Sequence, residues 1–124
     1  MVQGIGVDII EIARIRKSIE ELGPAFLTKV FTDAEIAYCS AKQNRYQHFA
    51  ARFAAKEAMS KALSTGWAGE FRWKDVEVTN DPSGQPRVTL HNRLRDLCAR
   101  ATVLLTISHS ETHVVAMVLV QEES

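Results

Sequence analysis

Near the N-terminus, apolar and small residues alternate as they do in a β-strand. Gly4, Gly6 and Asp8 occupy every second position of the run 3–10, which is otherwise mostly apolar, so we predict a strand with these three residues on one face. The glycines permit close backbone approach by a ligand, or they mark a β-bulge. In either case Asp8 lies on the glycine face.

Two helices are predicted in the next segment. Apolar residues follow helical spacing over 12–22, and a glycine-proline pair at 23–24 is expected to end that helix. Thr32 is followed three residues later by Glu35, which is the pattern of a capping box. We therefore expect a second helix over 33–42.

The longest helical pattern covers residues 46–63, which are rich in alanine and contain neither glycine nor proline. Phe49, Phe53, Glu57 and Lys61 recur every fourth residue and form one ridge of this helix. Much of the remaining circumference is apolar or small, so we expect the helix to lie centrally. Charged side chains in that setting require a structural or functional reason.

The C-terminal half returns mainly to strand patterns. Alternating apolar residues flank the turn-rich segment 81–84 and predict a hairpin, and strands over 103–108 and 114–120 predict another. A short helix over 94–101 is expected between the two hairpins. This order of elements predicts an α+β fold with a largely antiparallel sheet packed against the long helix. No linker or repeat divides the chain, so residues 1–124 are expected to form one domain.

Composition narrows the classes of function. The 124 residues carry 15 basic and 15 acidic side chains, and this balance argues against nucleic acid as a partner. No apolar stretch approaches the ~18 residues that span a membrane, and no basic leader precedes the first strand. Cys39 and Cys98 match neither a disulfide framework nor a zinc site. We therefore predict a cytoplasmic protein without a nucleic-acid or membrane partner.

Asp8 is the first candidate for chemistry. A carboxylate in an apolar strand is costly unless it is paired, capped or bound to a cation. Asp8 can instead cap the helix that begins near Ile12 or lie at an exposed strand end. From Asp8 alone, the structural interpretation is the more probable of the two.

Glu57 and Lys61 are the second candidate. One helical turn separates them, and such a pair is usually a surface ion pair worth a few tenths of a kcal/mol. Their place on the alanine-rich helix argues for a role beyond that. Two carboxylates from separate elements and a nearby ammonium suit a magnesium ion that holds a diphosphate.

Three further features are weaker. Ser108 and His109 are neighbours on a strand, so alternation sends them to opposite faces and excludes a hydrolase triad, although their donors can bind phosphate. Hairpin geometry alone accounts for Gly84 and Pro86, in preference to ligand binding. Five basic residues near the first three helices would offer an acidic partner a steering surface if they cluster. They are Arg14, Lys17, Lys42, Arg45 and Arg52.

Taken together, these segments resemble the bacterial holo-acyl-carrier-protein synthases, the small trimeric branch of the 4'-phosphopantetheinyl transferase family. The resemblance spans nearly the whole chain. Its specific part is the glycine-aspartate strand combined with a Lys-Glu-Ala-x-x-Lys helix. The segments that carry it are 4–12, 31–35, 52–63, 81–86 and 107–110.

The resemblance implies roles for particular residues. Asp8 and Glu57 would bind Mg²⁺, Lys61 would contact the diphosphate of coenzyme A, and Arg14 would belong to the surface where acyl carrier protein docks. Six further residues would hold the nucleotide, the last two from a neighbouring subunit of a homotrimer. They are Arg52, Ser60, Gly84, Pro86, Ser108 and His109.

The implied reaction transfers the 4'-phosphopantetheine moiety of coenzyme A to a serine of apo acyl carrier protein and releases adenosine 3',5'-bisphosphate. The serine attacks the phosphorus without a covalent enzyme intermediate, so catalysis consists of positioning and electrostatic stabilisation. The base is either Glu57 or a metal-bound water.

Two departures from the family pattern and two rival functions accompany this prediction. Ser64 stands where glycine is common, which reduces backbone freedom after the long helix, and Thr106 stands where serine is frequent. The same two carboxylates also suit metal-dependent hydrolysis of a nucleotide diphosphate. A non-catalytic trimer that binds a nucleotide or an acidic helix through Arg14 and Arg52 is the third possibility.

Overall fold

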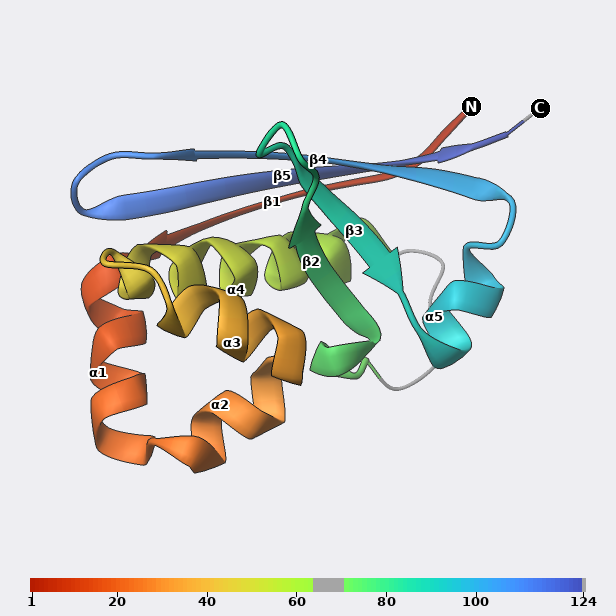
Figure 1. The fold of residues 1–124 in the computed structure, drawn as a ribbon. Helices are drawn as coiled ribbons and strands as arrows, with labels where there is room; N and C mark the ends of the chain where they lie inside the picture. The colour runs from red at the N-terminus through yellow and green to blue at the C-terminus, as the bar shows by residue number, and fades with distance from the viewer. Residues whose placement is uncertain (64–70, 124) are drawn as a thin grey trace.

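The computed structural model describes residues 1–63 and 71–123. Its main layer is an antiparallel sheet in the order β1–β5–β4, built from Val2–Glu11, His113–Glu122 and Ala101–His109 (Figure 1). Strand β5 lies in the centre because it pairs with β1 on one side and with β4 on the other. The α+β fold with an antiparallel sheet, predicted from the order of elements, is confirmed.

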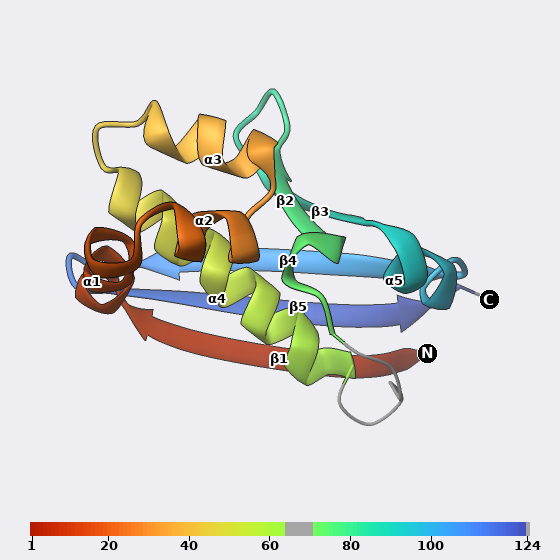
Figure 2. The ribbon, with the colours of Figure 1, turned by 90° about the horizontal axis from the view of Figure 1, so that it is seen from below.

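The helices of the N-terminal half lie on one side of this sheet (Figures 1 and 2). They are α1 (Ile12–Leu22), α2 (Pro24–Val30), α3 (Asp33–Ser40) and α4 (Arg45–Leu63). Helix α4 packs directly against β1 and β5 and crosses the sheet obliquely in Figure 2. The helix predicted over 46–63 is therefore present as α4, which contacts the main sheet as well as α1, α3 and β2.

The alternating glycines of β1 make room for the backbone of α4. A Cβ atom on Gly4 would lie 2.0 Å from the carbonyl oxygen of Ala62, and one on Gly6 would lie 1.9 Å from that of Ala58. Both separations are far below van der Waals contact, so only glycine fits at these positions. The close approach expected from the glycines is made by a helix of the same chain, and it brings α4 against the face of β1 that carries Asp8.

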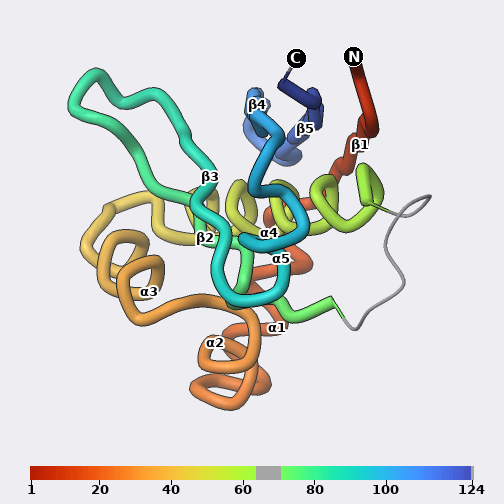
Figure 3. The backbone as a smooth tube through the Cα atoms, turned by 90° about the vertical axis from the view of Figure 1, so that its right-hand side faces the viewer, coloured from red at the N-terminus to blue at the C-terminus, as the bar shows by residue number. Residues whose placement is uncertain are grey.

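A second, two-stranded sheet lies beside the first. It consists of β2 (Val76–Asn80) and β3 (Pro86–Leu90), with a short 3₁₀ helix η1 (Trp73–Asp75) before it and α5 (Asn92–Leu97) after it. Strand β3 contacts β4, and Figure 3 shows the hairpin next to that edge of the main sheet. The hairpin predicted around 81–84 is confirmed.

A buried ion pair ties α4 to this hairpin. Lys56 and Glu35 are both fully buried, and the Lys56 ammonium lies 2.9 Å from Glu35 Oε1. The same ammonium donates to the carbonyl oxygens of Trp73 and Val76. Glu35 also accepts from the backbone N–H of Val78. The capping-box glutamate therefore joins α3, α4 and β2, in addition to capping its own helix.

The far face of the main sheet is apolar and open. Ile5, Val7 and Ile9 of β1 are 60%, 54% and 66% exposed, and Leu104 and Met117 continue this face on β4 and β5. In the part of the chain that the structure describes, no helix has the length and apolar character needed to cross a membrane.

One helix was missed by the sequence-based predictions, and the end of another was misplaced. Gly23 ends α1 with a left-handed φ of 56°, as predicted, but Pro24 then begins α2 because proline suits the first position of a helix. The helix predicted over 94–101 ends at Leu97, and Ala101 begins β4. The strand pairing with β5 competes successfully with the weak helical spacing there.

Candidate active site

The first part of the site lies where β1 meets α4. Asp8 points to the glycine face of β1, as predicted, and its side chain is 15% exposed. Lys61 extends from α4 and places its ammonium 3.2 Å from Asp8 Oδ1 and 3.0 Å from the carbonyl oxygen of Val7. Asp8 does not cap α1. This helix begins directly after Glu11, and no side chain caps its N-terminus.

Glu57 lies one turn before Lys61 and faces the same region. Partial burial raises the pKa of Glu57, and the negative charge of Asp8 raises it further, while Lys61 acts in the opposite direction. Two carboxylates that repel each other in this way favour a bound cation or proton between them. The convergence of Asp8 and Glu57 expected from the sequence is present.

These two carboxylates line a hollow of about 320 Å³, which we call the acidic pocket. Arg14 and Ser18 of α1, Phe26 of α2 and Phe53 of α4 also line it. The pocket thus combines two acids, one exposed arginine and an apolar wall. Arg14, predicted to help dock a partner, lies at the same hollow as the candidate metal ligands.

The donor set of the acidic pocket fits magnesium. Within residues 1–63 and 71–123, no three His, Cys, Asp or Glu side chains gather at one point. Two carboxylates are nevertheless the usual protein share of a magnesium site, because Mg²⁺ keeps waters and takes phosphate oxygens for its other positions. A closed cage of protein ligands is therefore not required.

The second part of the site lies on the other side of α4. Arg52, Gly84, Pro86 and His109, all predicted to hold a nucleotide, line a hollow of about 220 Å³ together with His48. We call it the cationic pocket. It brings together α4, the β2–β3 turn and the end of β4.

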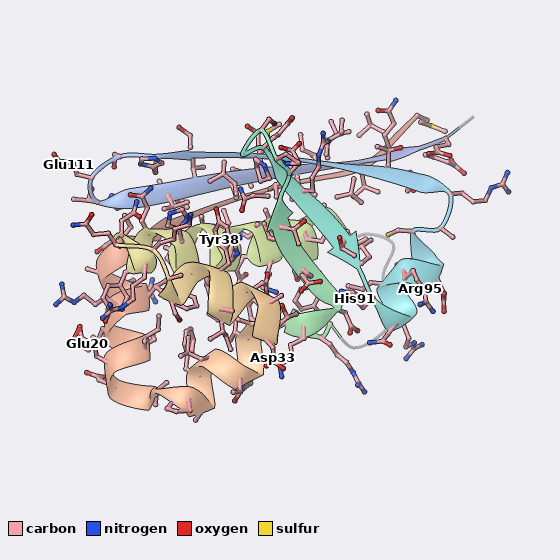
Figure 4. All side chains as sticks on the ribbon, in the orientation of Figure 1. Glu20, Asp33, Tyr38, His91, Arg95 and Glu111 are labelled. Carbon is pink, nitrogen blue, oxygen red and sulfur yellow. The ribbon has the colours of Figure 1, made fainter. Side chains whose placement is uncertain are left out.

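Arg52 is the central cation of this pocket. It is only 3% exposed, and its guanidinium lies 4.4 Å from the ring centre of Tyr38, which is labelled on α3 in Figure 4. Its Nη2 donates to Asn80 Oδ1 at 2.9 Å. Its Nε is buried and has no hydrogen-bond partner among the described residues. A buried donor without a partner is costly, and an anionic ligand would satisfy it.

The β2–β3 turn is built to hold its shape. Asp81 Oδ1 accepts from the backbone N–H groups of Ser83 and Gln85, both at 3.0 Å. Gly84 adopts a φ of 89°, which favours glycine, and its carbonyl oxygen accepts from Asn80 Nδ2. Asn80 therefore links the turn to Arg52, and this link explains why Gly84 and Arg52 share one pocket.

Comparison with known proteins identifies the family. The profile of the 4'-phosphopantetheinyl transferase superfamily matches residues 4–118. The chain belongs to this superfamily. The matched residues include Asp8, Glu57 and Lys61 as well as the lining residues of the cationic pocket. The resemblance seen in the sequence is confirmed.

Individual members of the transferase superfamily match over nearly their full length. A holo-[acyl-carrier-protein] synthase of Koribacter versatilis is 41% identical over 98% of this chain and 100% of the relative. The crystal structure of a Bacillus anthracis holo-(acyl-carrier-protein) synthase in complex with CoA (3',5'-ADP) has a TM-score of 0.82, with 35% identity over 99% of each chain. A Helicobacter pylori holo-[acyl-carrier-protein] synthase in complex with coenzyme A has a TM-score of 0.82 and 33% identity, covering 94% of this chain and 99% of that one.

Three predicted site residues of this transferase-family chain line neither of the two pockets: Lys61, which pairs with Asp8, and the two serines Ser60 and Ser108. Ser60 is half-buried on α4 and lines neither hollow. Ser108 is exposed on the far face of the sheet, in a shallow hollow with Ile9 and His113. Ser64, where the chain departs from the family pattern, lies outside the described residues.

Sequence reasoning missed Tyr38, His48 and Asn80. His48 precedes Arg52 by one helical turn, so helical spacing alone would have placed it on the face of α4 that carries Arg52. Tyr38 and Asn80 come from other elements, and no local pattern connects them to Arg52. The family resemblance implied that His109 reaches the nucleotide from a neighbouring subunit. In the structure, His109 and Arg52 line the same pocket within one chain.

Proposed function

We propose that the chain transfers the 4'-phosphopantetheine moiety of coenzyme A to a serine of apo acyl carrier protein and releases adenosine 3',5'-bisphosphate. Its family and the near full-length similarity to holo-acyl-carrier-protein synthases support this reaction. The observation that carries it is the shared pocket of Asp8 and Glu57 with Lys61 beside Asp8. We also propose that residues 1–124 act as one domain, while a cytoplasmic location stays a prediction.

In the proposed site, Asp8 and Glu57 hold Mg²⁺, which when bound supplies Lewis-acid stabilisation of phosphate charge. Coordination needs Glu57 deprotonated, and its raised pKa means that protons compete with the cation as the pH falls. The Lys61 side chain is 55% exposed beside Asp8, so its ammonium can pair with phosphate oxygens and offset charge on the leaving group. The apolar wall of Phe26 and Phe53 limits water at the reacting centre.

The two pockets suit different parts of coenzyme A, which carries a diphosphate and a ribose phosphate monoester. The acidic pocket suits the diphosphate through a cation, and the cationic pocket suits the monoester through Arg52, whose buried Nε is unpartnered. The carrier serine then attacks the phosphorus that bears the pantetheine arm. Arg14, exposed at the acidic pocket, is proposed to attract the acidic carrier protein.

We further propose that the active site is completed between subunits of a homotrimer. The acidic and cationic pockets have no lining residue in common within one chain. The exposed apolar face that includes Ile5, Val7 and Ile9 offers a surface for association. In this arrangement Arg52, Gly84, Pro86 and His109 act together from one subunit on coenzyme A held by Asp8 of the next. This differs from the sequence-based expectation, in which only Ser108 and His109 crossed the boundary.

A mass measurement tests the reaction. Apo acyl carrier protein incubated with the chain, coenzyme A and Mg²⁺ should gain the mass of phosphopantetheine. Controls without carrier protein measure hydrolysis of coenzyme A, which should be negligible. Carrier protein of unchanged mass, with the chain folded, would contradict the proposal.

Mixing two impaired variants, assayed at a coenzyme A concentration well below saturation, tests the shared site. Asp8→Ala and Arg52→Gln chains, denatured together and refolded at equal concentration, should recover about one quarter of the wild-type rate if each site takes one pocket from each of two randomly mixed neighbours. Each variant refolded alone is the control. No recovery from a mixture that forms mixed trimers would place the whole site in one chain.

A further inference from the structure

His48 is a histidine of the cationic pocket to which neither the family resemblance nor the proposed reaction gives a role. It lies on the first half of α4, is half-buried and lines the pocket beside Arg52 and His109. Its ring packs edge-on against Tyr38, with 5.7 Å between ring centres. Neither ring nitrogen of His48 has a hydrogen-bond partner among the described residues, and its contact with Tyr38 is ring packing alone.

The charges around His48 have the same sign on every element packed against it. Arg52 comes from α4, Lys42 from the segment after α3, and His109 from β4. Tyr38, on α3, gathers two of these cations, with Lys42 Nζ 4.7 Å and the Arg52 guanidinium 4.4 Å from its ring centre.

Acidic compensation is absent from this cluster as far as the structure describes the chain. Neither Lys42 nor Arg52 forms an ion pair there. On the hairpin, Asp81 at the β2–β3 turn pairs with Arg87 at 3.3 Å. Burial lowers the pKa of His48, and Arg52, Lys42 and His109 lower it further. His48 is therefore neutral in the free protein at physiological pH.

We infer that His48 is a binding residue for the phosphate monoester of coenzyme A, and that it takes up a proton when this group enters the cationic pocket. A phosphate dianion would offset the field of Arg52 and Lys42, because its two negative charges match their two positive charges. The imidazolium would then donate a charge-assisted hydrogen bond to a phosphate oxygen. The inference rests on the proposed function, since it requires coenzyme A in this pocket.

Two consequences distinguish this role from simple packing against Tyr38. Binding of coenzyme A should consume protons near neutral pH, and affinity should fall as the pH rises and the extra proton becomes harder to supply. Dephospho-coenzyme A lacks the monoester and should bind without the uptake that belongs to His48.

Isothermal titration calorimetry in buffers of different ionisation enthalpy measures the proton uptake directly. We compare the wild-type chain with His48→Phe, which keeps the ring packing, and with His48→Gln, which keeps a hydrogen-bond donor. Both variants should lose about half a proton of uptake with coenzyme A at pH 7, and none with dephospho-coenzyme A. At pH 6, His48→Phe should bind coenzyme A about tenfold more weakly than the wild type, and the difference should shrink above pH 8.

His113→Gln is the matched control, because His113 lies at the β4–β5 turn and lines no part of the cationic pocket. Its proton uptake should equal that of the wild type. Unchanged uptake in both His48 variants, while phosphopantetheine transfer continues, would overturn the role of His48 and leave the proposed function standing. If the folded wild-type chain bound no coenzyme A, both proposals would fall.

Discussion

The two pockets on either side of α4 manage charge in opposite ways. In the acidic pocket two carboxylates repel each other, Lys61 offsets part of their charge, and Arg14 lines the same hollow. In the cationic pocket, Arg52 and two histidines come together with Lys42 nearby, and Arg52 has a buried donor with no partner among the described residues. One pocket is thus prepared for a cation and the other for an anion. A ligand with metal-bound and free phosphate groups satisfies both.

The two pockets also differ in the contacts that hold their charged side chains in place. Asp8 and Glu57 are placed by the close packing of α4 on the glycines of β1. Arg52 is placed by hydrogen bonds and ring contacts, through Asn80 and Tyr38. The acidic pocket therefore depends on backbone contact, and the cationic pocket depends on side-chain contacts.

Removal of a carboxylate from the acidic pocket should have the largest effect. Asp8→Ala should lower the transfer rate by about 10³-fold, because it removes one of two protein ligands of the cation and the partner of Lys61. The rate is followed by the mass of the carrier protein at saturating coenzyme A. Thr28→Ala, at an exposed position on α2, is the control and should retain full activity. An Asp8→Ala rate within tenfold of the wild type would remove Asp8 from the chemistry.

Breaking the buried Lys56–Glu35 pair, which ties α4 to α3 and β2, should destabilise the fold. Lys56→Met leaves the Glu35 carboxylate buried without its counter-ion and should lower the free energy of unfolding by about 3–5 kcal/mol. Urea denaturation followed by circular dichroism measures this change. The double variant Lys56→Met with Glu35→Met removes both charges and should recover part of the loss. A single variant as stable as the wild type would show that the pair contributes nothing.

A change in the cationic pocket should affect binding more than chemistry. Arg52→Gln keeps a hydrogen-bond donor but removes the charge, so the Kd for coenzyme A should rise about thirtyfold. The affinity for dephospho-coenzyme A should change much less, because that ligand lacks the monoester. Calorimetric titration of both ligands gives the two constants. Equal losses for the two ligands would separate Arg52 from the monoester.

The smallest effect concerns pH and stability at the acidic pocket. The pKa of Glu57 is raised in the folded chain, so its contribution to stability is present below its ordinary pKa of 4.5 and is lost as the pH rises through the folded value. Glu57→Gln should therefore raise Tm by about 2 °C at pH 7 without Mg²⁺ and leave it unchanged at pH 4. Thermal melts at both pH values test this sign. A lower Tm at pH 7 would show that Glu57 is stabilising where repulsion is predicted.

Local patterns predicted most elements and the acidic part of the site. Alternation identified the face of β1 that carries Asp8, and helical spacing placed Glu57 one turn from Lys61. These predictions hold because strand and helix periods are properties of the backbone. The same reasoning missed helix α2, because a proline that follows the end of one helix can also begin the next.

The amino-acid sequence by itself determined most of the elements, the α+β class and the pair of carboxylates with their lysine. Tertiary structure alone decided that Tyr38, His48 and Asn80 surround Arg52, and that the two pockets are separate within one chain. It also decided that the glycines of β1 admit a helix. The physical reason is the distance along the chain over which each property is determined. Backbone periodicity depends on neighbouring residues, whereas charge clusters and close backbone contacts form between elements that only folding brings together.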